Sequence, residues 1–166
     1  MKNSKNPLIY LVEDDPIFRK MIDAYLKTQR LTHIKQFGSG EEMLVEFAKV
    51  VPDLVVEDYE LGLGKLNGLE IFKKAKEIKP DISFIFLSGQ SSIELAIGTI
   101  KEGAYDYVVK DDFAKENLLN RIKKFVFQKQ LVDKQQVYKI AAISIIVSLA
   151  IILTVLYISG LRFVFT

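Results

Sequence analysis

The sequence predicts an α/β fold, in which a parallel β-sheet carries helices on both faces, followed by one apolar helix. Apolar runs of strand length alternate with amphipathic stretches of about ten residues, which is the pattern of repeated strand–helix–strand units. Four of these runs end on a charged or hydroxyl side chain, and ligands gather at the carboxyl ends of parallel strands. A stretch of 22 residues without a charge, 140–161, follows the last unit.

Five runs are predicted as strands because they are short and mostly rich in Val, Ile, Leu and Phe, as strands buried on both faces are. The second run alternates only loosely between apolar and polar residues, and Pro52 precedes the third. The predicted strands cover residues 8–12, 32–37, 54–58, 82–87 and 104–109.

Five further stretches are predicted as helices from their start signals and apolar spacing. Pro16 suits the opening turn of the first helix, and Ser91 with Glu94 forms a capping box for the fourth. The predicted helices cover residues 16–28, 41–50, 68–79 and 91–102, with a fifth that starts at 113. Five strands and five helices fit a flavodoxin-like (βα)5 arrangement, a doubly wound parallel sheet with right-handed connections.

Apolar spacing also predicts which side of two helices is buried. For the first helix the predicted inward residues are Ile17, Met21, Ala24, Tyr25 and Leu26. For the second helix they are Met43, Leu44, Phe47 and Ala48.

Carboxylates follow two of the predicted strands. Asp58 ends the third strand, and Glu13, Asp14 and Asp15 follow the first. If these strands are neighbours, several carboxylates share one pocket, and like charges that close need a partner to remain ionised. The predicted occupant is a hard divalent cation, Mg²⁺, because it prefers oxygen ligands.

The fourth strand delivers Ser88 and the fifth delivers Lys110, so the four strand ends carry acid, acid, hydroxyl and amine. The motifs that contain them are LVEDDP, DLVVEDYEL, FLSG and YDYVVK. Together and in this order they resemble the receiver domain of two-component response regulators, over roughly residues 7–127. The resemblance implies a domain that takes a phosphoryl group from a histidine kinase onto an aspartate.

The resemblance also implies a role for each acid. Asp58 would be the phosphoacceptor, attacking the phosphorus of a phosphohistidine to form an aspartyl phosphate. Asp14, Asp58 and the backbone carbonyl of Glu60 would ligate Mg²⁺ directly, and Glu13 would act through water. Asp15 lies one residue beyond the family's acidic pair, and we interpret it as a residue that starts the first helix.

For the remaining site residues, the resemblance implies that Ser88 donates its hydroxyl to one phosphoryl oxygen and Lys110 pairs with another. Ser88 and Tyr107 would form the switch that responds to phosphorylation. Two departures stand out. Asp111 follows the lysine where many receivers have a cis proline, and a cis bond before a non-proline residue costs about 3–4 kcal/mol. Glu57 places an acid directly before the phosphoacceptor, where it either repels a phosphodonor or points away.

Charge divides the chain into three parts, although the overall net charge is only +2. Residues 1–112 carry a net charge of −4, residues 113–139 carry +5, and only Arg162 is charged beyond them. We therefore predict a receiver domain over 1–127, a basic helical connector over 128–139, a transmembrane helix over 140–161 and a short tail over 162–166.

The uncharged stretch is long enough to cross a bilayer, since 22 helical residues extend about 33 Å against about 30 Å of hydrocarbon. A helix that is apolar on every side and additional to the sheet's own helices favours a membrane span over a core helix. Seven Lys and Arg residues lie between 115 and 139 and one lies after the span. The positive-inside rule then places the receiver domain on the cytoplasmic side of the cell membrane.

The sequence thus predicts a phosphorylation-dependent receiver tethered to the membrane, which is not a turnover enzyme. We expect no DNA-binding output domain and no nucleic-acid partner, and therefore an output through protein contacts. Ser144 and Ser148 form a small-xxx-small pair that would permit a homodimer, a question that the sequence leaves open.

Two alternatives belong to other classes. A phosphorylation-independent membrane adaptor would keep the receiver fold as a scaffold, and the retained Asp58, Ser88 and Lys110 argue against it. A phosphohydrolase of the haloacid dehalogenase type requires a second aspartate two residues after the nucleophile, and this chain has Glu60 there.

Overall fold

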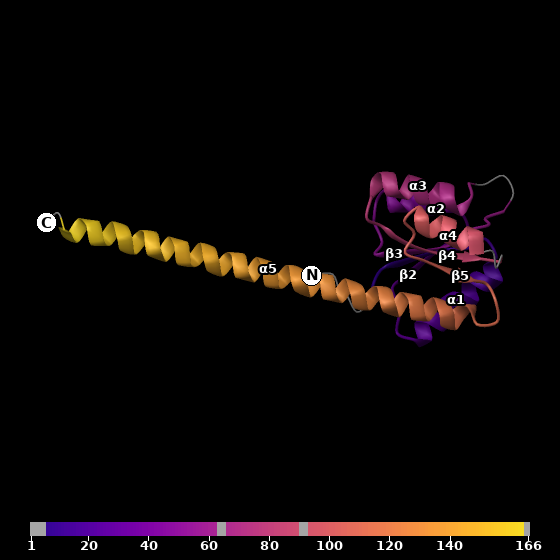
Figure 1. The fold of residues 1–166 in the computed structure, drawn as a ribbon. Helices are drawn as coiled ribbons and strands as arrows, with labels where there is room; N and C mark the ends of the chain where they lie inside the picture. The colour runs from indigo at the N-terminus through magenta and orange to yellow at the C-terminus, as the bar shows by residue number, and fades with distance from the viewer. Residues whose placement is uncertain (1–5, 63–65, 90–92, 165–166) are drawn as a thin grey trace. The chain divides into compact units, whose positions relative to one another are not determined.

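A computed structural model describes residues 6–62, 66–89 and 93–164, and its ribbon alternates strands and helices along the chain (Figure 1). The elements are β1 (Ile9–Val12), α1 (Pro16–Thr28), β2 (Ile34–Phe37), α2 (Gly40–Phe47), β3 (Leu54–Asp58), α3 (Gly68–Ile78), β4 (Ser83–Ser88), α4 (Ile93–Lys101), β5 (Asp106–Val109) and α5 (Ala114–Val164).

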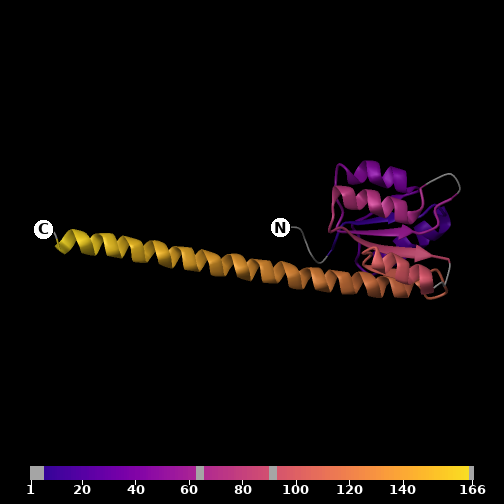
Figure 2. The ribbon, with the colours of Figure 1, turned by 45° about the horizontal axis from the view of Figure 1, so that its top comes forward.

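The five strands form one sheet in the order β2-β1-β3-β4-β5, and every pair is parallel. The strand arrows accordingly point the same way (Figure 2). β1 and β3 are neighbours, with Val12 opposite Glu57, and β3 pairs with β4 through Asp58 opposite Leu87. The predicted flavodoxin-like sheet is confirmed, and its carboxyl edge brings together the ends of β1, β3, β4 and β5.

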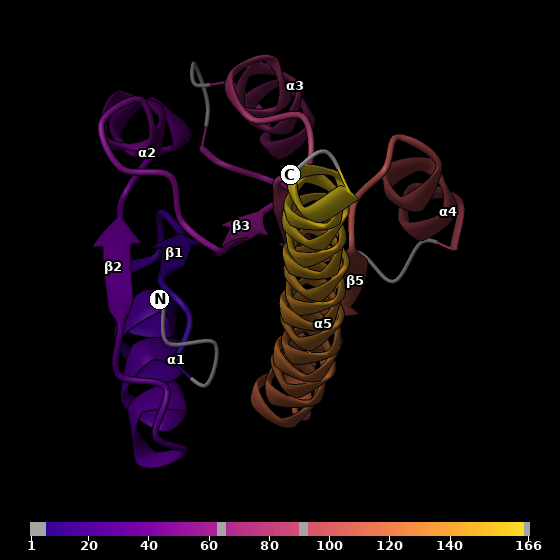
Figure 3. The same cartoon turned by 90° about the vertical axis from the view of Figure 1, so that its left-hand side faces the viewer.

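The sheet separates two hydrophobic layers because successive strand residues point to opposite faces. Ile9 and Leu11 of β1 face a layer completed by Ile22 and Leu26 of α1 and by residues of α5 up to Phe125. The opposite layer is built from Tyr10 and Val12 together with residues of α2 and α3, and α4 lies on that side too (Figure 3). Strands buried on both faces explain the continuous apolar runs.

The predicted inward face of α1 is partly wrong. Leu26 is buried and Tyr25 is half-buried, but Ile17, Met21 and Ala24 are exposed. The residues that reach the core, Phe18, Ile22, Tyr25 and Leu26, are spaced by four, three and one. Both sets have helical spacing, and the position of the sheet relative to α1 selects the second one.

The start of α2 and its two largest core residues agree with the prediction, but its end does not. Met43 and Phe47 are fully buried and Leu44 is half-buried, whereas Ala48 is exposed. The helix ends at Phe47, three residues earlier than predicted, and Ala48 is its C-terminal cap.

Side chains cap the first turns of helices α1 and α3 by accepting hydrogen bonds from backbone N–H groups. The Asp15 carboxylate accepts hydrogen bonds from the backbone N–H groups of Ile17 and Phe18, as the interpretation of Asp15 requires. Asn67 and Glu70 form a capping box at the start of α3, which the sequence reading did not identify. The predicted capping box of Ser91 and Glu94 involves side chains outside the described part of the chain.

By its internal contacts the chain divides into two units, Met1–Val126 and Phe127–Thr166. Within the described residues, α5 is the one helix that is long and apolar enough to cross a membrane. Its part Ala114–Tyr157 contains an 18-residue window with a mean hydropathy of 2.7 and no buried residue. The predicted long apolar helix is therefore present, and its insertion in a membrane stays a prediction.

Candidate functional site

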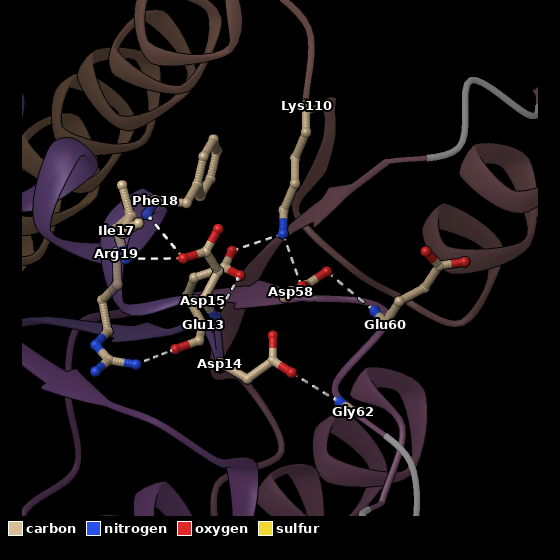
Figure 4. A network of polar contacts seen from close by, with 10 residues as sticks. All are labelled: Glu13, Asp14, Asp15, Ile17, Phe18, Arg19, Asp58, Glu60, Gly62 and Lys110. Atoms are coloured by element: carbon tan, nitrogen blue, oxygen red, sulfur yellow. Dashed lines mark hydrogen bonds and ion pairs between the residues drawn. The ribbon is translucent and has the colours of Figure 1, made fainter.

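Asp58 lies at the carboxyl end of β3 and is 4% exposed. Its Oδ2 accepts a hydrogen bond of 2.7 Å from the Lys110 Nζ, and its Oδ1 accepts one of 3.0 Å from the backbone N–H of Glu60 (Figure 4). The lysine follows β5 at the same edge of the sheet. The strand order thus places a carboxylate and an ammonium group in direct contact across 52 residues of sequence.

The acids after β1 complete the site. Glu13 is buried and its Oε2 lies 2.7 Å from the same Lys110 Nζ. The Asp14 Oδ2 accepts a hydrogen bond of 3.0 Å from the backbone N–H of Gly62, which follows β3. Glu13, Asp14 and Asp58 each offer one carboxylate oxygen within 4.8 Å of the others. Figure 4 shows the Glu13 and Asp58 carboxyl groups at the end of the lysine and the Asp14 carboxylate below them, beside Gly62.

Burial shapes the charges of this cluster. Burial, followed by the nearby charge of Asp58, raises the pKa of Glu13 to about 7, although the hydrogen bond from Lys110 acts in the opposite direction. For Lys110, burial alone would lower the pKa, but the hydrogen bonds and charges of Asp58 and Glu13 outweigh it and raise the pKa. The ammonium group therefore stays charged beside the carboxyl groups of Asp58 and Glu13.

The donor set fits Mg²⁺. Three carboxylate oxygens from neighbouring strand ends are hard ligands, and so few protein ligands leave room for the water molecules that Mg²⁺ retains. The backbone N–H of Glu60 bonds to Asp58, and the carbonyl of Glu60 as a ligand stays a prediction, as does the water-mediated role of Glu13.

The structure brings Ser88 to the same edge. Ser88 ends β4, is fully buried, and its backbone carbonyl accepts a hydrogen bond of 2.8 Å from the N–H of Lys110. Tyr107 lies three residues before the lysine on β5, half-buried beside Phe86 of β4. With residues of α4 it lines a shallow cavity of about 330 Å³. The switch roles of Ser88 and Tyr107 stay predictions.

The loop after Lys110 needs no cis bond, because the described backbone contains none and the lysine still reaches Asp58. Asp111 instead accepts a hydrogen bond from the backbone N–H of Phe113 in the turn before α5.

Two residues of α1 also contact the site, and sequence reasoning did not connect either of them with it. The Lys110 ammonium lies 4.8 Å from the centre of the Phe18 ring, and the Arg19 guanidinium donates to the backbone carbonyl of Glu13. Both residues lie in the first turn of α1, a position that sequence spacing alone does not connect with the site.

Glu57 points away from the site. It is 0% exposed, and consecutive strand residues face opposite sides, so Glu57 faces the layer of α2 and α3. Among the described residues, neither of its carboxylate oxygens has a hydrogen-bond partner. Burial, followed by the charges of Asp58 and Glu41, raises the pKa of Glu57 well above its ordinary value of 4.5. Burial thus favours the protonated form of Glu57, which is a core residue and not a second acid facing the phosphodonor.

Because the pKa of Glu57 is raised in the folded protein, we expect the free energy of unfolding to depend on pH. The folded protein keeps a proton on Glu57 that the unfolded chain releases above pH 4.5, so the free energy of unfolding falls as pH rises from there toward the raised pKa. Glu57→Gln is neutral at every pH and should lose this decline. We expect the variant to gain stability relative to the natural protein between acid and mildly alkaline pH, measured by urea unfolding. A difference between the two proteins that is constant with pH would contradict the protonated state.

Comparison with known proteins agrees with this geometry. The family model for the response regulator receiver domain matches residues 9–123. The C4-dicarboxylate transport transcriptional regulatory protein DctD of Rhizobium meliloti is 27% identical over 84% of this chain and 29% of its own length. The response regulator protein TmoT of Ectopseudomonas mendocina is 28% identical over 73% of this chain and 53% of its own length. This chain thus spans about half or less of these relatives.

Among solved structures, the BeF3-activated DrrB receiver domain is 34% identical, with a TM-score of 0.62, and the match covers 71% of this chain and 95% of that one.

Proposed function

Because the chain belongs to the response regulator receiver family, we propose that it accepts a phosphoryl group on Asp58 from a histidine kinase or a phosphotransfer protein. The observation that carries this proposal is the buried Asp58 carboxylate, held 2.7 Å from the Lys110 ammonium beside two further carboxylates. Receiver domains are signalling modules and not turnover enzymes. The chain would therefore catalyse only its own phosphorylation and slow dephosphorylation.

Each side chain contributes a distinct step. An Asp58 carboxylate oxygen attacks phosphorus, and the leaving group departs on the opposite side. Lys110, already at that carboxylate, neutralises the charge on a phosphoryl oxygen, and Ser88 donates its hydroxyl to another. Asp14, Asp58 and the backbone carbonyl of Glu60 would hold Mg²⁺, with Glu13 acting through water, and the ion would supply further positive charge to the transferring group. Tyr107 and Ser88 would then report the phosphorylated state to a partner.

The test is transfer of a phosphoryl group in the presence of Mg²⁺, first from acetyl phosphate and then from a panel of histidine kinases. The expected product carries a hydroxylamine-sensitive acyl phosphate, and removal of Mg²⁺ by a chelator should prevent its formation. No transfer from any donor would favour the phosphorylation-independent adaptor.

Replacing Asp14 tests the metal site. Asp14→Ala removes one of few protein ligands, so the Mg²⁺ concentration for half-maximal binding should rise about tenfold or more. Phosphorylation should fall with it. Asp15→Asn is the matched control, because it also removes a carboxylate but keeps the helix cap. An unchanged Mg²⁺ titration for Asp14→Ala, with a loss in Asp15→Asn, would move the metal to Asp15.

The tether is the second part of the proposal. Residues 140–161 would span the cytoplasmic membrane once, after the basic connector 128–139, with the receiver domain 1–127 in the cytoplasm and 162–166 beyond the span. The hydropathy of α5 supports the span, and the basic residues before it support the orientation. Output would reach a partner protein by contact and would not involve nucleic acid.

A further inference from the structure

The connector part of α5 carries large exposed apolar side chains that a membrane span does not explain, since they precede residue 140. Phe127 is 61% exposed, Leu131 45% and Tyr138 73%. At about 100° per residue, these three positions and Lys134 fall within about 60° of one another around the helix axis. We call Phe127, Leu131, Lys134 and Tyr138 the connector stripe.

We infer that the connector stripe binds a second copy of this chain, in parallel, as a short two-stranded coiled coil. Its members follow one another after four, three and four residues, which is the alternation of the two core positions in a heptad repeat. The inference rests on the proposed membrane span. In two copies that cross the membrane through residues 140–161, the two connectors run in the same direction and start at the same depth. Each residue of the connector stripe therefore lies opposite the same residue of the second copy.

The residues beside the stripe permit close approach although the connector is basic. In a parallel pair, the positions that flank the core contact the facing helix. All four of these positions are uncharged: Gln128, Gln130, Gln135 and Val137. Lys129, Asp133 and Lys139 occupy the positions turned away from the partner. The charges of the connector are thus concentrated where two copies do not repel each other.

The same spacing continues into the proposed span through Ala141, Ile145, Ser148 and Ile152. Ala141 and Ser148 are small and recur after seven residues, which lets two apolar helices approach closely in lipid. The Ser148 hydroxyl donates to the backbone carbonyl of Ser144 at 2.8 Å, so its hydrogen bond is satisfied within its own helix. One continuous face of α5 therefore suits the second copy on both sides of the membrane boundary.

Lys134 is the one charged member of the stripe, and it would meet its counterpart in the partner copy. A lysine at a single core position weakens a coiled coil while fixing its register. Lys134→Leu should therefore strengthen the association, and Leu131→Lys should weaken it. Val132→Lys is the matched control, because Val132 is the next residue, is 52% exposed and lies on another side of the helix.

The absence of cysteine from the chain allows a direct test. Single-cysteine variants of the full chain in phospholipid vesicles are oxidised, and the disulfide-linked dimer is measured on a denaturing gel. Leu131→Cys and Tyr138→Cys should give at least about fivefold more dimer than Val132→Cys and Gln136→Cys, because core positions face their counterparts across a parallel pair and these two control positions face away. In the Tyr138→Cys background, Lys134→Leu should raise the yield and Leu131→Lys should lower it, with Val132→Lys unchanged.

Equal yields on all sides of the helix, or yields that vanish as lipid is added in excess, would overturn the inference. Membrane pelleting and phosphorylation of the same samples separate the possible failures. If the chain inserts in the membrane and is phosphorylated but the yields lack the periodicity, only the inference fails. If the chain does not insert, the tether and the inference fail together.

Discussion

Asp58→Asn should reduce phosphorylation by about two orders of magnitude or more, because an amide lacks the anionic oxygen that attacks phosphorus. The substitution preserves size, and the amide oxygen that it introduces can still accept a hydrogen bond from Glu60 or Lys110. The fold should therefore survive, as judged by circular dichroism. The measurement is the amount of radioactive phosphate transferred to the protein from a labelled phosphodonor, together with the sensitivity of that label to hydroxylamine.

The matched control is Glu57→Gln, which makes the same chemical change one residue earlier on the opposite face of the sheet. Because Glu57 is buried away from the site, its variant should keep its label. Full label on Asp58→Asn would remove Asp58 as the phosphoacceptor. Loss of label in both variants would indicate a disturbed strand β3 and not a missing nucleophile.

Removal of the apolar part of α5 should separate tethering from phosphorylation. Expressed in a bacterium, the 166-residue chain should pellet with membranes and resist high salt and carbonate, since burial of apolar side chains in lipid is not screened by ions. A chain that ends at Lys134 should be soluble and still accept a phosphoryl group, because the site residues all precede Lys134.

The orientation of the chain across the membrane provides a second test of the span. A reporter fused after Thr166 should register outside the cytoplasm and one fused before Met1 inside, as the excess of Lys and Arg before the span predicts. If salt washes the 166-residue chain from the membrane, α5 lies on a surface or packs against protein, and the span is wrong.

Buried polar residues mark where sequence reasoning reached its limit. The positions of Asp58, Glu13, Asp14, Ser88 and Lys110 at strand ends follow from apolar runs that stop abruptly, and parallel pairing then collects them at one edge. The sequence could not show that the Lys110 ammonium contacts both Glu13 and Asp58. Such contacts depend on strand order, and periodicity carries no information about which strands are neighbours.

By itself, the sequence determined the alternation of strands and helices, the residues that end each strand and the uncharged stretch of α5, because hydrophobic period and charge are local properties. Only the tertiary structure decided which face of α1 is buried. Helical spacing is compatible with burial of either Ile17 or Ile22, and the sheet covers only the side of Ile22. It also decided the direction of Glu57. A strand residue can face either layer, and only the pairing of β3 between β1 and β4 places Glu57 in the core and leaves Asp58 at the site.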